Sequence, residues 1–87
     1  MIHLIRILPE GDATLALTFS DGSSAQWSAA ELIARDTVMT RPLADPTYFA
    51  RAFIKAGALA WPHGFELSAT SLHRRLDEAG TLISSAA

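Results

Sequence analysis

The sequence predicts an α+β domain in which a small, mostly antiparallel sheet of about five strands carries two or three short helices packed on one face. Three observations lead to this class. Residues 13–20 alternate apolar and polar side chains, which is the period of a strand with one buried face. Residues 53–61 form two short apolar segments around Gly57, which is typical of a hairpin. Leu72 and Leu76, four positions apart, predict an amphipathic final helix.

The apolar pattern also determines the register of the first hairpin. Residues 2–8 are mostly apolar, with three β-branched isoleucines, and predict an opening strand; residues 23–28 return after the alternating strand. A three-residue loop at 20–22 keeps the apolar residues of both strands on one face, whereas a two-residue loop sends Trp27 to the other face. Gly22 suits the positive φ that ends such a loop. The predicted pairs are Phe19 with Ser23, Leu17 with Ala25, and Leu15 with Trp27.

Two further helix starts are predicted from their capping residues. Ser28 followed by Glu31 has the spacing of a capping box, which predicts a short helix over residues 29–34. Asp45 and Pro46 begin a helical turn with proline at its first position, where its missing N–H costs nothing. The aromatic residues that follow, Tyr48 and Phe49, are expected to face inward.

The last helix defines the end of the domain. Ser68 is the best cap for a helix over residues 69–79, and Gly80 is well placed to end it. Residues 1–80 are therefore predicted to form a single domain, and residues 81–87 a loose tail whose two apolar residues are able to dock on it.

Composition narrows the classes of function. The 87 residues are 49% hydrophobic with a mean hydropathy of +0.21, which leaves apolar surface for a partner, and a homodimer is one way to cover it. The absence of cysteine excludes disulfides and thiol chemistry. No apolar run approaches the roughly 18 residues of a membrane span. Without the features of a signal peptide at the N-terminus, we expect a cytoplasmic protein.

Charge is unevenly distributed although the net charge is only −2. Residues 1–36 hold two cations against five anions, and residues 41–75 hold five cations against two anions. One interpretation of this pattern is ordinary solvated charge. The other is that the charge asymmetry attracts an acidic partner or a second copy of the chain. The negative net charge argues against nucleic acid as the main partner.

Three short motifs occur in one order along the chain: "FSDG", "PLADPTYF" and "WPHGFEL". This order resembles the DUF2442 family of small bacterial proteins of uncharacterised function, over roughly residues 2–76. The matching residues are Phe19, Asp21, Gly22, Pro42, Leu43, Asp45, Phe49, Trp61, Pro62, Gly64 and Leu67. The resemblance implies an α+β fold, no established enzymatic activity, and occurrence beside small toxin–antitoxin-like genes. Some members of that family carry a helix-turn-helix after this domain.

The "WPHGFEL" stretch has a structural and a functional interpretation. Pro62 ends the strand after Trp61, and Gly64 permits the chain to reverse. His63 stands where the family usually has Asn, and Glu66 where it usually has Asp. A purely structural turn is one interpretation, and a rigid loop that presents Trp61, His63 and Glu66 to a partner is the other. A catalytic His63/Glu66 pair lacks a nearby nucleophile, so we expect no catalytic residues.

The last helix carries a basic segment, His73-Arg74-Arg75, away from its apolar stripe. A solvated face is the simplest interpretation, contact with an acidic protein the second, and nucleic-acid binding the third. The three histidines lack the spacing of a metal site, so we expect neither a metal nor another cofactor.

We therefore expect a non-enzymatic protein-interaction or regulatory module that binds a small toxin-like protein or a second copy of itself. The expected contact surface consists of Trp61, His63, Glu66, Arg74 and Arg75. The alternative is a transcription-associated module that binds DNA as a dimer. That function requires a continuous basic stripe through Arg41, Arg51, Lys55, Arg74 and Arg75. A third alternative is a small hydrolase or ligand-binding protein with a closed pocket around His63 and Glu66.

Overall fold

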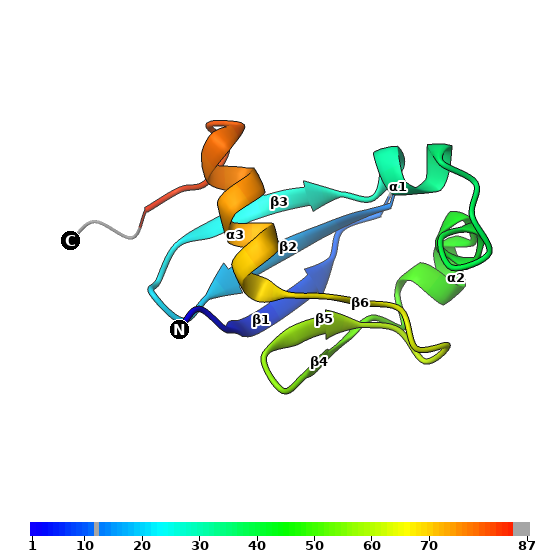
Figure 1. Cartoon of the computed structure of the whole chain (residues 1–87), viewed down its shortest axis with the longest axis horizontal. Coiled ribbons are helices and arrows are strands. Elements are labelled where there is room, and N and C mark those ends of the chain that lie inside the picture. The colour runs from blue at the N-terminus through cyan, green and yellow to red at the C-terminus, as the bar shows by residue number, and fades with distance from the viewer. Residues whose placement is uncertain (12, 85–87) are drawn as a thin grey trace.

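A computed structural model describes residues 1–11 and 13–84 of the chain (Figure 1). The described part has the predicted α+β class, with two antiparallel sheets of three strands each and three α-helices. The elements are β1 Leu4–Pro9, β2 Thr14–Phe19, β3 Ser24–Ser28, α1 Ala30–Ala34, the 3-10 helix η1 Arg41–Ala44, α2 Pro46–Phe49, β4 Phe53–Lys55, β5 Ala58–Ala60, β6 Glu66–Leu67 and α3 Ala69–Glu78.

The strands are divided between two sheets, where we expected one sheet of about five strands. The strand orders are β1-β2-β3 and β4-β5-β6. The sheets meet where the Leu4 N–H donates to the Gly57 carbonyl at 2.8 Å. Directly after Leu4 the register of β1 shifts, so that Ile5 is an extra residue in the strand. Such a bulge increases the local twist and directs the rest of β1 away from the second hairpin.

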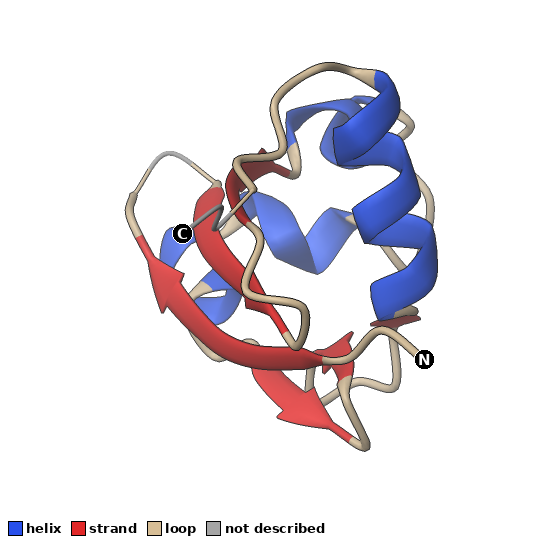
Figure 2. Ribbon diagram, turned by 90° about the vertical axis from the view of Figure 1, so that its left-hand side faces the viewer, coloured by secondary structure: helices blue, strands red, loops and turns tan. Residues whose placement is uncertain are grey.

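The core lies between the β1-β2-β3 sheet and α3, which crosses the inward face of that sheet (Figures 1 and 2). β2 contributes Leu15, Leu17 and Phe19, all with at most 1% exposure. α3 contributes Leu72 and Leu76, which confirms the predicted apolar stripe. The largest fully buried side chains of the described residues are Trp61, Phe19, Leu15, Leu17, Leu43 and Leu59.

The predicted register of the first hairpin is confirmed. Leu17 pairs with Ala25 and Leu15 with Trp27. The Phe19 N–H donates to the Ser23 carbonyl at 2.8 Å, which closes the three-residue loop. Gly22 has a φ of +86°, a conformation that a residue with a Cβ adopts only with strain.

The helix starts are confirmed in two cases and displaced in one. Asp45 caps α2 by accepting from the Thr47 N–H, and Ser68 caps α3 by accepting from the Ser71 N–H. At α1 the Ser28 hydroxyl accepts from the Ala30 N–H, and the helix begins one residue later than predicted. The reason is that the Ala29 N–H still donates to the Ala13 carbonyl and is therefore held by the preceding sheet.

The second hairpin and the end of α3 also follow the sequence. Ile54 pairs with Leu59 across a two-residue turn. At the other end, the N–H groups of Gly80 and Thr81 donate to the carbonyls of the last turn of α3. This pattern is the Schellman motif, which satisfies carbonyls that the helix leaves free.

The two apolar residues after Gly80, which we expected to be able to dock, contact the domain. Ile83 and Ser24 exchange two backbone hydrogen bonds, at 2.9 and 2.7 Å, so that the chain docks on the free edge of β3. Leu82 is half-buried against the core. The remainder of the predicted tail, residues 85–87, lies outside the described residues.

Candidate functional site

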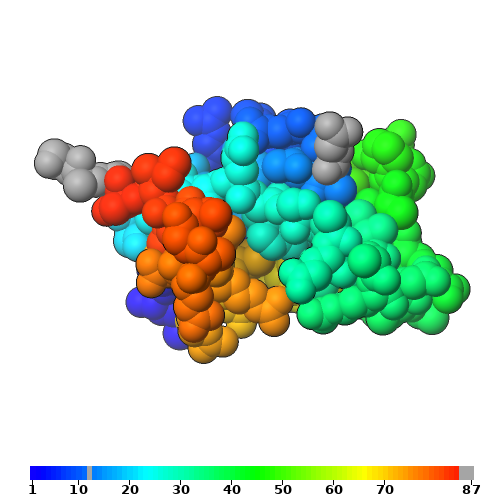
Figure 3. All heavy atoms as spheres, turned by 90° about the horizontal axis from the view of Figure 1, so that it is seen from above, coloured from blue at the N-terminus to red at the C-terminus, as the bar shows by residue number. Residues whose placement is uncertain are grey.

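A cleft of about 490 Å³ separates α3 from α1 and the end of β3. Figure 3 shows this hollow between the orange α3 and the teal α1, with β6 at its base. Its apolar lining consists of Trp27, Leu32, Leu67, Leu72 and Leu76. Trp27 is half-buried, so part of its indole ring is available to a group that enters the cleft.

The periodicity of α3 produces one wall of the cleft. The helix and its cap contribute Ser68, Ser71, Leu72, Arg75 and Leu76, which follow the spacing of a single helix face. The leucines at the bottom of this face belong to the core, and Arg75 at the top is exposed. An amphipathic helix therefore joins the hydrophobic interior to a charged rim.

Four charged side chains surround the cleft: Glu31, Arg35, Glu66 and Arg75. The carboxylate of Glu66 accepts from the ammonium of Lys55 at 3.1 Å, in a pair whose side chains are both more than one-third exposed. Within the described part of the chain, neither Arg35 nor Arg75 takes part in an ion pair. Two guanidinium groups are thus available to carboxylates of another molecule.

The structure brings two of the five predicted contact residues, Glu66 and Arg75, to this cleft. Arg74 is exposed on α3 but does not line it. The prediction for Trp61 is wrong, because its side chain is 1% exposed and belongs to the core. Its indole N–H donates to the Phe49 carbonyl at 3.0 Å, and its ring packs against those of Phe49 and Phe65.

His63 has a structural role that the sequence did not reveal. Its Nε2 lies 2.8 Å from the Met39 carbonyl, which only accepts, so Nε2 carries the proton in this arrangement. Its Nδ1 then accepts from the Tyr48 hydroxyl at 2.5 Å, and the oxygen of that hydroxyl accepts from the His63 backbone N–H at 2.9 Å. His63 therefore connects the turn after Trp61 to Tyr48 in α2 and to Met39, which precedes η1.

The His63/Glu66 pair considered for catalysis does not form. The imidazole of His63 bonds to Tyr48 and Met39, whereas the carboxylate of Glu66 bonds to Lys55. Glu66 lines the α1–α3 cleft and His63 does not. The two side chains thus serve different parts of the surface.

A second histidine joins α3 to the first hairpin. The Nε2 of His73 lies 2.9 Å from Oδ2 of Asp21, and Ser23 donates to Oδ1 through both its hydroxyl and its backbone N–H. The imidazole also packs against the Phe19 ring in a T-shaped arrangement, with centroids 5.1 Å apart. The order is serine–carboxylate–imidazole, so the histidine does not contact the serine hydroxyl and is not its general base.

The hydrogen bonds from Ser23, together with the bond and charge of His73, lower the pKa of Asp21 from 3.8 to about 2. We expect this carboxylate to stabilise the fold fully above pH ~4. Its contribution is lost as the pH falls through about 2, because the proton then binds the folded state as well as the unfolded state. In thermal melts, the difference between wild type and Asp21→Asn should be constant at neutral pH and shrink between pH ~4 and pH ~2.

The Ser23→Ala variant tests whether the lowered pKa of Asp21 depends on the Ser23 hydroxyl, as distinct from a general loss of stability in acid. It removes the hydroxyl that contributes most to the lowered pKa and leaves the backbone hydrogen bond to Asp21 in place. The ¹³C titration of the Asp21 carboxyl should therefore move to higher pH in this variant. An unchanged titration midpoint would contradict the role assigned to the hydroxyl.

The cations considered for DNA binding are dispersed over the described surface. Arg41 lies on η1 and pairs with Asp36 at 2.9 Å, and Lys55 lies on β4 and pairs with Glu66. Arg51 follows α2, with its guanidinium carbon 5.7 Å from the centroid of the Tyr48 ring. α3 lies far from η1 and α2 in two perpendicular views (Figures 1 and 3). These residues do not form the continuous stripe that DNA binding requires.

In the described part of the chain, no three His, Asp or Glu side chains are grouped so as to hold a metal ion. No helix there is both long and apolar enough to cross a bilayer. Comparison with known proteins finds no family model that matches the chain, no similar curated protein and no similar solved structure.

Proposed function

We propose that the protein is a non-enzymatic interaction module that binds a segment of a partner protein in the α1–α3 cleft. The observation that supports this function is the combination of an apolar floor with two arginines on the rim that have no ion pair in the described residues. The partner would place an apolar side chain against Trp27 and Leu72 and an acidic side chain near Arg35 or Arg75.

Physical chemistry favours such an occupant. Burying the remaining exposed part of an indole ring contributes about 25 cal/mol per Å² of apolar area removed from water. Tryptophan and arginine are also the residue types that most often dominate the energy of protein interfaces. Glu31 and Glu66 on the same rim would repel additional carboxylates and so restrict where the acidic group of a partner is placed.

The hydrolase alternative has less support at this cleft. Neither His63 nor His73 lines it, so a general base of that type is not next to Ser68 or Ser71. The Ser68 hydroxyl is already the acceptor that caps α3. A volume of about 490 Å³ also suits a small molecule. Selection with peptides as the probe distinguishes the two kinds of ligand, because only a peptide-binding cleft enriches them.

Membership of the DUF2442 family, with a small toxin-like protein as partner and a cytoplasmic location, is part of this proposal. The residues that carry the resemblance have scaffold roles here. Phe19, Phe49 and Trp61 are buried, and Asp45 caps α2. If a family is defined by such positions, its members share the fold and differ on the cleft rim, where each would select its own partner.

The test is selection of peptides from a random library on the immobilised wild-type domain. Enriched peptides should combine a large apolar residue with Asp or Glu. Arg75→Glu should weaken their binding at least about fivefold, because it replaces an attraction by a repulsion at the rim. Arg74→Glu is the matched control, since it makes the same charge change on the same helix outside the cleft. Failure to enrich any peptide, or equal binding by the two variants, would refute this function.

A further inference from the structure

The β1-β2-β3 sheet has an outward face that no described helix covers (Figure 2). Small side chains in its middle, at Ala16, Thr18 and Ser24, leave a trough of about 720 Å³. Two large apolar side chains border the trough and are conspicuously exposed, Leu8 at 48% and Ile83 at 66%. A sheet face of this kind is stabilised when a second layer removes its apolar groups from water.

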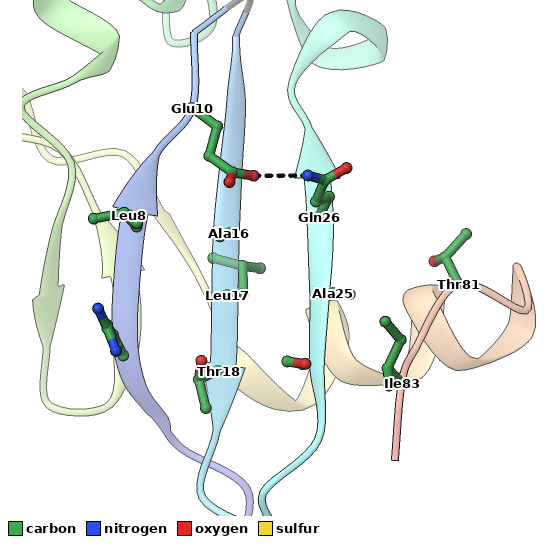
Figure 4. A pocket seen from close by; sticks show the side chains of 11 residues that line it. Leu8, Glu10, Ala16, Leu17, Thr18, Ala25, Gln26, Thr81 and Ile83 are labelled. Carbon is green, nitrogen blue, oxygen red and sulfur yellow. Dashed lines mark hydrogen bonds between the residues drawn. The ribbon is translucent and has the colours of Figure 1, made fainter. Parts of the chain in front are cut away.

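The charged groups of this face are arranged symmetrically about Leu8. Arg6, Leu8 and Glu10 follow one another at every second position and all border the trough. At about 3.4 Å per residue, Arg6 and Glu10 are roughly 14 Å apart along the strand, which is too far for an ion pair within one chain. Neither side chain has an ion pair in the described residues. Glu10 accepts from the Gln26 amide through Oε1, and its Oε2 has no partner there (Figure 4).

We infer that this face is the interface of a homodimer in which two sheets stack with their strands antiparallel about a two-fold axis at Leu8. Rotation about an axis that lies in the interface and crosses the strands at Leu8 places each Arg6 opposite Glu10 of the second copy. The same rotation brings the two Leu8 side chains together and lays Ala16 over Ala16. An isologous interface has to be complementary to itself in this way.

Charge is what identifies the occupant as a second copy. Arg6 and Glu10 lie at equal distances on either side of Leu8. A second copy in antiparallel orientation presents the same charges in reverse order, so that each cation faces an anion. The sheet itself lies between this face and α3 (Figure 2). The trough and the α1–α3 cleft share only Gln26 and Thr81, at the edge of the sheet, whereas the apolar floor of the cleft lies on the side of α3. A dimer would therefore leave both α1–α3 clefts open, and the inference is independent of the proposed function.

Sedimentation velocity over a concentration series tests the dimer. Wild type at ~100 μM should be mainly dimeric if the Kd is in the micromolar range. Arg6→Glu creates two Glu–Glu contacts across the axis, and Glu10→Arg creates two Arg–Arg contacts. Each variant alone should raise the Kd at least about tenfold, because like charges then face each other.

Mixing the two variants makes the test specific. The Arg6→Glu chain carries only glutamates at these positions and the Glu10→Arg chain only arginines, so both cross-axis contacts become attractive in a heterodimer. The mixture should dimerise although neither component does, and Arg74→Glu on α3 should dimerise like wild type. A monomeric wild type would overturn the inference. So would single variants that stay dimeric, or a mixture that stays monomeric while both variants are folded by circular dichroism.

Discussion

Trp61→Ala is expected to lower the free energy of unfolding by about 3–5 kcal/mol, since it removes the largest buried side chain and leaves a cavity. The indole touches three aromatic rings, those of Trp27, Phe49 and Phe65. A domain of this size has a total stability of only about 5–15 kcal/mol, so the variant should lose a large part of it. Urea denaturation followed by circular dichroism measures the change, and the melting temperature should fall by at least about 12 °C.

Two companion variants show which property of Trp61 matters. Trp61→Phe keeps an aromatic ring but removes the N–H that donates to the Phe49 carbonyl. Because that carbonyl also accepts from the Ala52 N–H, we expect a smaller loss, about 1–2 kcal/mol. Phe53→Ala is the control, because it removes an aromatic ring that is 41% exposed and should cost less than about 1 kcal/mol. A Trp61→Ala variant as stable as Phe53→Ala would contradict the core role of Trp61 and favour the predicted role in the contact surface.

Local chemistry explains why much of the fold was predictable. The three-residue loop, the Ser68 cap and the end of α3 each depend on residues within about six positions of one another. Side-chain alternation then places Leu15 and Trp27 on the same face without any information from elsewhere in the chain.

The candidate site depended on contacts between distant segments. Burial of Trp61 requires a carbonyl acceptor twelve residues earlier, and the role of His63 requires the hydroxyl of Tyr48. His73 and Asp21 are 52 residues apart, and neither has a local signal that predicts the other. The cleft itself results from the placement of α1 relative to α3. Sequence patterns identified Glu66 and Arg75 as available charges, but only the fold brings them to one opening.

Two separate surfaces result from this arrangement, and their chemistry differs. The α1–α3 cleft has an apolar floor and two rim arginines, Arg35 and Arg75. The charges on its rim are not arranged to match those of a second copy, so the cleft suits a different protein as partner. The outward sheet face repeats its charges about a central leucine, which suits another copy. A dimer would present two identical clefts, so a partner with two binding segments would gain affinity by binding both at once.

Gly57 controls the junction on which the placement of the two sheets depends. Its φ is +84°, and a Cβ added there would lie 3.0 Å from both Cβ and Nδ1 of His3. His3 has little freedom to move away, because its N–H donates to the Ser20 hydroxyl and its carbonyl accepts from the Ser20 N–H. The Gly57 carbonyl also accepts from Leu4, the bond that joins the sheets.

Gly57→Ala is therefore expected to lower the free energy of unfolding by about 2–5 kcal/mol. Roughly 1–2 kcal/mol comes from the left-handed backbone and roughly 1–3 kcal/mol from overpacking against His3. Urea denaturation measures the total. Hydrogen exchange adds a local measurement, because the Leu4 amide should exchange faster when the overpacking weakens its bond to residue 57.

Gly80→Ala supplies the matched control, because Gly80 has a similar φ of +74° but no atom within 4 Å of an added Cβ. It should lose only the backbone contribution of roughly 1–2 kcal/mol. In a double-mutant cycle, His3→Gly removes all three crowding atoms, so Gly57→Ala in that background should cost about as much as Gly80→Ala. If Gly57→Ala costs the same with and without His3→Gly, the contact with His3 does not hold the junction. The positions of the two sheets must then be maintained by the core alone.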